Sequence, residues 1–250
     1  MKIFLRLWLP LLFTIWISYL FLDRPLCEFV HDQGIPEYLT SECLLEHWPA
    51  LTHNEGKDAS LVVQLVEWPP LMSGIAPLLM IFAFFLKSGR PKYLLNLMGI
   101  SILLTFVLKN ELKWVFSRYW PVTWTHQNLS WISDHAYGFQ WFQGRIFLGN
   151  DQMGSFPSGH AAIAFAALLP VGMVYRKLMP SVIFLALLEA LFMVAFNYHF
   201  LSDIIAGIVV GSLCAMLVDR LLSSTDTLVR QMTRGSSSLS DSCASGVIRS

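Results

Sequence analysis

Apolar stretches of near-bilayer length recur along this chain of 250 residues and constrain its fold more than any other feature. A hydrocarbon core about 30 Å thick needs roughly 20 apolar helical residues. Six stretches approach that length, at 3–21, 69–86, 93–112, 159–175, 180–198 and 203–221. Because only 14% of the residues are charged and 55% are hydrophobic, burial of all six in one soluble core is not expected. The sequence predicts an all-α integral membrane protein with six transmembrane helices.

The first stretch, 3–21, has two readings. A cleaved signal peptide would explain its basic start at Lys2 and Arg6 and its apolar middle. However, no small-residue cleavage pattern precedes Asp23, and the apolar run is long for such a peptide. We therefore expect a retained membrane anchor.

The distribution of charge predicts how the helices are oriented. Basic residues cluster before the first stretch, between the second and third, between the fourth and fifth, and after the sixth. Cytoplasmic loops carry an excess of Lys and Arg, so both termini are expected in the cytoplasm. The segments 23–68 and 113–158 then lie outside, and in the first of them acids outnumber Arg24 and Lys57. We expect the membrane to be the bacterial inner membrane.

The six stretches define one membrane domain over residues 1–222. Residues 223–250 are rich in Ser, Thr and Gly and almost free of apolar residues, which predicts a disordered cytoplasmic tail. In the outer loop 23–68, Cys27 and Cys43 would meet an oxidising compartment. Either a disulfide between them or two free thiols is expected.

Three polar clusters border the predicted outer face. They are KWVFSRYWP at 113–121, PSGH at 157–160 and NYHFLSD at 197–203. The predicted topology places all three on the same side of the membrane, where they can meet in one water-accessible pocket.

Two histidines in these clusters suit phosphoryl transfer. Asp203 follows His199 by four residues at a helix start, where a carboxylate can hold one imidazole nitrogen and leave the other as a base or nucleophile. With His160 as the second imidazole, one histidine can attack phosphorus while the other protonates the leaving oxygen.

The same clusters offer a place for a phosphate group. Backbone N–H groups at a helix N-terminus bind anions, and Ser158 and Gly159 stand where the fourth stretch begins. Lys113 and Arg118 supply positive charge at the same level of the membrane.

The motifs resemble those of the type 2 phosphatidic acid phosphatase superfamily, which also contains the vanadium haloperoxidases. The family pattern is Lys-x6-Arg-Pro, then Pro-Ser-Gly-His, then Ser-Arg-x5-His-x3-Asp, and the resemblance extends over residues 70–220. It implies an enzyme that needs no metal and no cofactor. It also implies these roles: His199 as the nucleophile that forms a phosphohistidine, Asp203 as its orienting partner, His160 as general acid, and Lys113, Ser158 and the Gly159 N–H as phosphate-binding groups.

Two family arginines are missing from this chain. Trp120 stands where Lys-x6-Arg-Pro has its arginine, and Met193 stands six residues before His199. We expect Arg118 to replace them as the phosphate clamp, with Arg145 as a weaker candidate.

These features favour a membrane lipid phosphatase with an outward-facing active site. Its substrate would be a phosphomonoester or pyrophosphate of a lipid, and its surroundings the lipid bilayer. Two alternatives stay open: a lipid phosphotransferase, or a catalytically silent member that binds phospholipid. A haloperoxidase fits less well, because those proteins are soluble.

Other partners and sites receive less support. The net charge of zero gives no basic signature for nucleic acid. No HExxH or CxxC motif suggests a metal site. Glu189, in the middle of an apolar stretch, is equally open to a functional and a structural role.

Overall fold

The computed structural model describes residues 2–36, 68–122, 128–143 and 153–246. Over these ranges the chain is helical, with isolated β-bridges and no strand. The elements are α1 (Lys2–Ile17), the π-helix η1 (Ser18–Leu22), α2 (Asp23–Asp32), α6 (Trp68–Phe85), α7 (Arg90–Phe116), α8 (Trp131–Asp134), α9 (Gly159–Val174), the 3-10 turn η3 (Arg176–Leu178), α10 (Met179–Ala195) and α11 (Leu201–Gly246).

All six predicted apolar stretches are helical. Five helical segments within the described ranges are long and apolar enough to cross a membrane: Leu9–Asp32, Trp68–Phe85, Arg90–Phe116, Arg176–Ala195 and Leu201–Thr225. The remaining stretch forms α9, which is apolar but has only 16 residues. These helices indicate an integral membrane protein.

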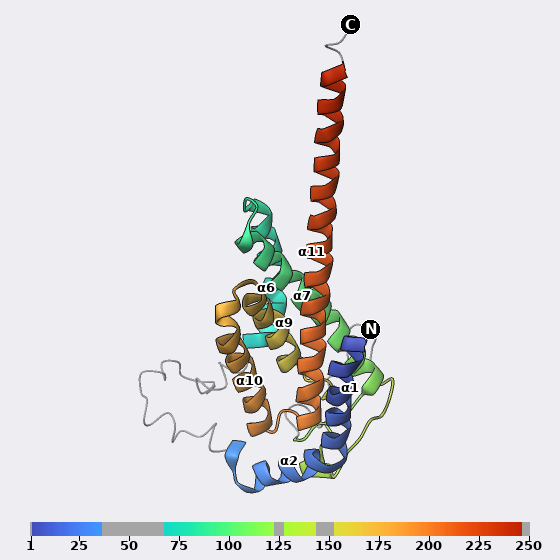
Figure 1. Cartoon of the computed structure of the whole chain (residues 1–250). Coiled ribbons are helices and arrows are strands. Elements are labelled where there is room, and N and C mark those ends of the chain that lie inside the picture. Colours follow the sequence, from blue (N-terminus) through green and yellow to red (C-terminus); the bar gives the residue numbers. More distant parts are fainter. Residues whose placement is uncertain (1, 37–67, 123–127, 144–152, 247–250) are drawn as a thin grey trace, which may run out of the picture.

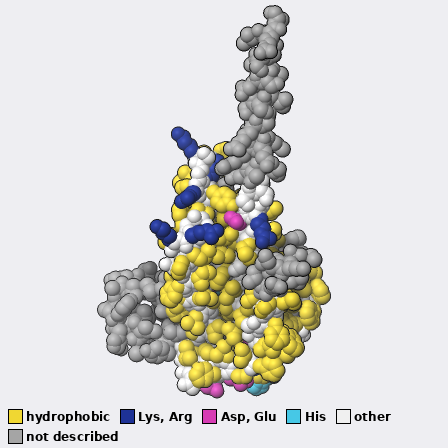
Figure 2. Space-filling view, in the orientation of Figure 1, with side chains coloured by type: hydrophobic (Ala, Val, Ile, Leu, Met, Phe, Trp, Pro, Cys, Tyr) yellow, Lys and Arg dark blue, Asp and Glu magenta, His cyan; other side chains and the backbone are white. Residues whose placement is uncertain are grey.

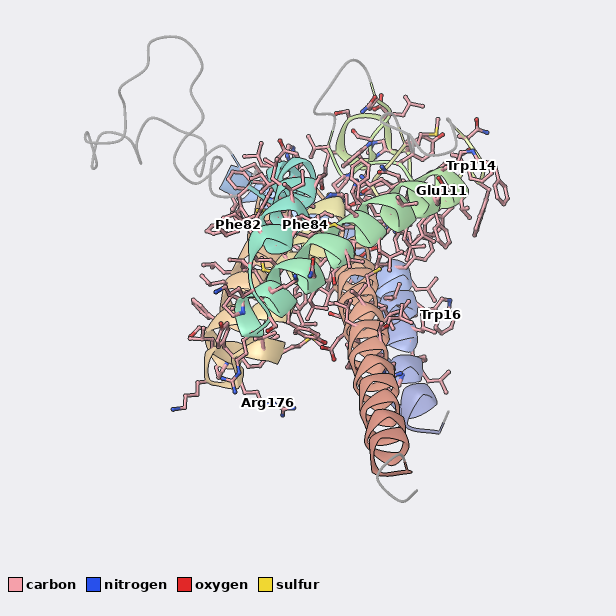
Figure 3. The ribbon with its side chains drawn as sticks, turned by 90° about the horizontal axis from the view of Figure 1, so that it is seen from above. Trp16, Phe82, Phe84, Glu111, Trp114 and Arg176 are labelled. Atoms are coloured by element: carbon pink, nitrogen blue, oxygen red, sulfur yellow. The ribbon has the colours of Figure 1, made fainter. Side chains whose placement is uncertain are left out.

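Large apolar side chains cover the outside of the bundle, as a bilayer requires. More than half of the surface of Trp16 on α1, Phe84 on α6 and Leu191 on α10 is exposed. Seen from above, Trp16 points away from α11, and Trp114 lies at the far end of α7 (Figure 3). The face shown in Figure 2 is accordingly mostly hydrophobic.

The core of the bundle is α9, which packs against α6, α7, α10 and α11 (Figure 1). Its residues from Ala161 to Ala167 are all buried, and five of the seven are alanine. On α11, Gly207 and Gly211 face the backbone of α9 so closely that an added Cβ would overlap carbonyl oxygens of Ser158 and Ala162. Small residues spaced in this way let two membrane helices approach at backbone distance.

Charge is distributed unequally between the two ends of the bundle. Exposed basic side chains occur at Lys87 and Arg90, just before and at the start of α7, and at Arg176 and Lys177 before α10. In Figure 2 most of the Lys and Arg side chains gather near the end from which α11 projects, while acidic residues and a histidine lie at the opposite end. The residues that follow α7 and α10, including His199, lie at that opposite end.

The structure differs from the sequence prediction at both ends of the membrane domain. The helix that begins as α1 continues through η1 into α2, so the segment from Asp23 to Asp32 is helical. α11 likewise runs to Gly246, beyond the other helices, where the sequence predicts a disordered tail (Figure 1). At the last residues of this helix whose side chains the structure describes, hydroxyl groups donate to helix carbonyls, as Thr225 Oγ1 does to the Leu221 carbonyl at 2.8 Å. Cys43, the proposed partner of the buried Cys27, lies outside the described residues.

Candidate active site

The three polar clusters predicted to meet do so at one end of the bundle. The Ser158 backbone N–H donates to the Asp203 carbonyl at 2.9 Å, and the Ser155 N–H donates to the Arg118 carbonyl at 3.2 Å. These bonds join the start of α9, the start of α11 and the segment after α7. The prediction that the clusters lie together is therefore confirmed.

His160 and His199 face each other across this site, with ring centroids 6.1 Å apart. His199 is buried, with 2% of its surface exposed, and its backbone N–H donates to the Met193 carbonyl at 3.3 Å. Its Nδ1 lies 3.7 Å from Oδ2 of Asp203, so Nε2 is the ring nitrogen that does not face this carboxylate. Burial lowers the pKa of His199, and Asp203 opposes this without reversing it. The imidazole is thus neutral near pH 7, as a nucleophile requires.

Asp203 is fixed by donors on both carboxylate oxygens. Oδ2 accepts from the Ser155 hydroxyl at 2.6 Å and from the Phe200 backbone N–H at 3.0 Å. Oδ1 accepts from Nη1 of Arg118. A carboxylate held in this way can orient the imidazole beside it.

Arg118, for which the sequence predicts the role of phosphate clamp, is fully buried and is paired with two carboxylates. Its Nη2 lies 2.7 Å from Oδ2 of Asp23, while Nη1 is paired with Asp203. Its Cζ lies 4.3 Å from the Phe200 ring centroid, and Tyr137 accepts a further bond from Nη2 at 3.1 Å. Burial alone would lower the pKa of Arg118, but the two carboxylates raise it, so the group stays charged. The guanidinium therefore serves two carboxylates inside the protein.

Asp23 is a site residue that the sequence analysis missed. Its carboxylate is buried and accepts from the backbone N–H of Ser202 at 2.9 Å as well as from Arg118. The sequence analysis assigned Asp23 to an exposed acidic loop, because acids are numerous between 23 and 68. One signal could have found it: Asp23 is the first acid in the chain and stands directly at the end of an apolar stretch.

The start of α9 presents the expected anion-binding groups. Ser158 is the N-cap of α9, since its hydroxyl oxygen accepts from the Ala161 N–H at 3.4 Å. Gly159 follows as the first helical residue. Backbone N–H groups of a first helical turn attract anions, and a cap that uses only the oxygen of Ser158 leaves its O–H able to donate.

Two lysines of α7 line the same place. Nζ of Lys113 lies 5.3 Å from the ring centroid of Trp120, whose ring lies 5.3 Å from that of His199. One turn earlier, Lys109 reaches the start of α9: a Cβ placed on Gly159 would lie 3.6 Å from its Nζ. The sequence analysis did not single out Lys109, although its spacing of four residues from Lys113 puts both on one helix face.

The two positions without the family arginine differ in their surroundings. Trp120 lies beside His199, and within the described part of the chain its buried Nε1–H has no hydrogen-bond acceptor. Met193 is fully buried in an apolar cluster with Ala161, Ala190, Phe196 and Ile204. The Met193 position therefore contributes no charge to the site. Arg145, the weaker clamp candidate, lies outside the described residues.

Comparison with known proteins places this site in a family. No curated protein and no solved structure matches the chain. The family model described as PAP2 superfamily matches residues 92–224, which include the Lys113, His160, His199 and Asp203 positions. Because the match covers more than half of the 250 residues, the chain belongs to the PAP2 superfamily, that of the type 2 phosphatidic acid phosphatases.

Proposed function

We propose that the protein is a membrane phosphatase that hydrolyses a phosphomonoester or pyrophosphate of a lipid through a phosphohistidine at His199. Membership of the PAP2 superfamily supports phosphatase activity on phosphate esters. The observation that carries the proposal is the pair of imidazoles 6.1 Å apart at the N-terminus of α9, one of them beside a fixed carboxylate.

In the first step, Nε2 of neutral His199 attacks phosphorus, and the bond from phosphorus to the lipid oxygen breaks. Protonated His160 gives its proton to that oxygen, so the lipid leaves as an alcohol, or as a monophosphate when the substrate is a pyrophosphate. Asp203 faces Nδ1 and stabilises the positive charge that His199 gains.

In the second step, water attacks the phosphohistidine. His160, now neutral, takes a proton from that water, the phosphorus–nitrogen bond breaks, and inorganic phosphate leaves. His199 returns to its neutral form, and the protonated His160 is ready for the next substrate. Atoms and charges thus balance without any further reactant.

The negative oxygens of the phosphoryl group need fixed donors during both steps. The N–H groups at the start of α9 and the Ser158 hydroxyl supply hydrogen bonds. Lys113 and Lys109 supply two positive charges from one face of α7. Since Arg118 and Met193 do not provide this charge, the lysines take the place of the family arginines.

A lipid substrate suits the position of the site. The site lies at one end of helices whose outer surfaces are apolar, so an amphiphile can keep its tails in the bilayer while its phosphate reaches the histidines. The exposed basic residues lie at the opposite end, which by the positive-inside rule supports an outer-leaflet site with both termini in the cytoplasm.

The proposal is tested with the purified full-length protein and a panel of lipid monophosphates and pyrophosphates. We expect phosphate release that persists in EDTA, is inhibited by vanadate and is lost in His199→Ala. Rapid quenching with a radiolabelled substrate should trap an acid-labile, alkali-stable phosphoprotein. If no substrate released phosphate, the result would favour the catalytically silent, phospholipid-binding alternative. The apolar surroundings of Met193, which supply no charge for a phosphate, support that alternative. Transfer of label to an added lipid acceptor would favour the phosphotransferase.

A further inference from the structure

We propose that Asp23 is a positioning residue of this active site. Through Arg118 it sets the placement of the Asp203 carboxylate and the net charge of the cluster beside His199. The inference rests on the proposed function and deepens it. It makes the N-terminal helix, which lies outside the matched residues 92–224, a working part of the site.

The contact chain is continuous and fully buried. Nη1 of Arg118 pairs with Oδ1 of Asp203, and Nη2 lies 2.7 Å from Oδ2 of Asp23. Ser202 ties both ends together, because its hydroxyl donates to Asp23 and accepts from Nη1 of Arg118 at 2.6 Å. None of these four side chains has appreciable solvent exposure. A shift of Asp23 must therefore be passed on to Asp203.

The charges of this cluster add up to one net negative charge. Two carboxylates share a single guanidinium, so Asp203 is only partly neutralised by Arg118. The remaining negative charge is available to His199, whose imidazole becomes positive when it attacks phosphorus. Without Asp23, Arg118 would be paired with Asp203 alone, and the cluster beside His199 would become neutral.

Two further features indicate that the N-terminal helix is built around this contact. Its path is interrupted by the π-helix η1 directly before Asp23, and such turns occur frequently at functional sites. One turn after Asp23, the Cys27 carbonyl accepts a hydrogen bond from the Asn197 side chain at 3.0 Å. The N-terminal helix therefore contacts the turn that carries His199 at two points, Asn197 before the histidine and Ser202 after it.

Several charged groups act on His199, and the test must separate Asp23 from them. From α11 the imidazole faces Asp203, from α7 Lys113, and from α9 His160. Behind Asp203 lie Arg118, Tyr137 and Asp23. The main variants below therefore change Asp23 alone and leave these other groups in place.

The experiment compares purified full-length Asp23→Asn with Asp32→Asn, an exposed acid of the same helix, on one substrate with a good leaving group. We expect kcat per folded molecule to fall about 10- to 100-fold in Asp23→Asn, with KM within about threefold of wild type. The acidic limb of the kcat/KM profile should move to lower pH by roughly half a unit or more, because a lost negative charge lowers the pKa of His199. Asp23→Glu should restore part of kcat, and Asp32→Asn should match wild type.

A purely structural role would lower the amount of folded enzyme and leave kcat per folded molecule and the acidic limb unchanged. That result in Asp23→Asn would overturn the inference. If Asp23→Asn does not fold, Ser202→Ala keeps every charge but removes a link between Asp23 and Arg118, and kcat per folded molecule must fall severalfold.

A second readout does not depend on turnover. NMR titration of histidine-labelled protein, with the His199 signal assigned from its loss in His199→Ala, should give a lower His199 pKa in Asp23→Asn than in wild type. An unchanged His199 pKa would overturn the inference even in an inactive protein. Absence of turnover in the wild type would count against the proposed function alone, so the two failures are distinguishable.

Discussion

Gly211 of α11 faces the backbone of Ala162 of α9 so closely that a single added Cβ would overlap the Ala162 carbonyl group. His160 and His199 stand near the starts of these same two helices, with ring centroids 6.1 Å apart. The distance between the two proposed catalytic groups thus depends on a helix contact with no polar chemistry of its own.

Gly211→Ala should therefore lower both stability and turnover. The obstacle is a backbone carbonyl, which cannot rotate away as a side chain can, so the helices must separate. Overpacking of this kind costs about 1–3 kcal/mol. The matched control is Gly74→Ala on α6, where an added Cβ meets no atom within 4 Å and helix propensity improves by about 0.5–1 kcal/mol. Thermal unfolding in detergent measures the stability of both variants, and an activity assay measures their turnover. Equal effects of the two substitutions would contradict the packing argument.

Arg118→Met should greatly lower the fraction of molecules that fold, because it leaves the carboxylates of Asp23 and Asp203 buried without a counter-charge. Removing one member of a buried ion pair costs about 3–5 kcal/mol. Arg118→Lys should recover only part of this, since one ammonium cannot reproduce the two-sided geometry of the guanidinium. Size-exclusion profiles and thermal unfolding report the folded fraction. A well-folded, stable Arg118→Met variant with weakened vanadate binding would restore the clamp role instead.

The contrast between Arg118 and the apolar stretches shows what could be predicted from the sequence. Apolar length is a local property, so all six helical stretches could be located without the structure. The order of the three motifs and the helix count then sufficed to bring His160 and His199 together. The pairing of Arg118 with Asp23 could not be found in this way, because Asp23 is far away in sequence and its burial depends on how α1 continues through η1.

Lys109 and Met193 illustrate the same limit. A lysine at the end of an apolar stretch usually marks the membrane surface, and only the packing of α7 against Gly159 shows that Lys109 reaches the site. Met193 is an ordinary apolar residue by sequence, and its place in a fully apolar cluster is a tertiary fact.

The pH dependence of phosphohistidine formation should reflect the lowered pKa of His199. Only neutral His199 attacks phosphorus, and its neutral fraction falls as the pH drops through its pKa. Since burial places this pKa below the ordinary histidine value of about 6.5, the acidic limb should be centred below pH 6.5. Single-turnover rates with a good leaving group isolate this limb, because such a substrate needs little protonation by His160. A limb centred above pH 6.5 would show that Asp203 outweighs burial.

Lys109→Met should weaken phosphate binding, because its Nζ lies at the start of α9, 3.6 Å from the place a Cβ of Gly159 would occupy. A positive charge beside the first helical turn adds to the attraction of the backbone N–H groups for an anion. We expect KM for the lipid phosphate and the inhibition constant for vanadate to rise about tenfold, a loss of about 1.4 kcal/mol in binding.

The companion variants separate charge from packing. Lys109→Arg keeps the charge and should stay within about threefold of wild type in vanadate inhibition, which corresponds to well under 1 kcal/mol. The control Lys87→Met removes an exposed lysine before α7, at the other end of that helix, and should leave vanadate inhibition unchanged. If Lys109 only packs its alkyl chain against neighbours, such as the ring of Phe106 below its Nζ, Lys109→Met should keep wild-type vanadate inhibition. Equal vanadate inhibition in Lys109→Met and wild type would leave Lys113 as the cation that holds the phosphate.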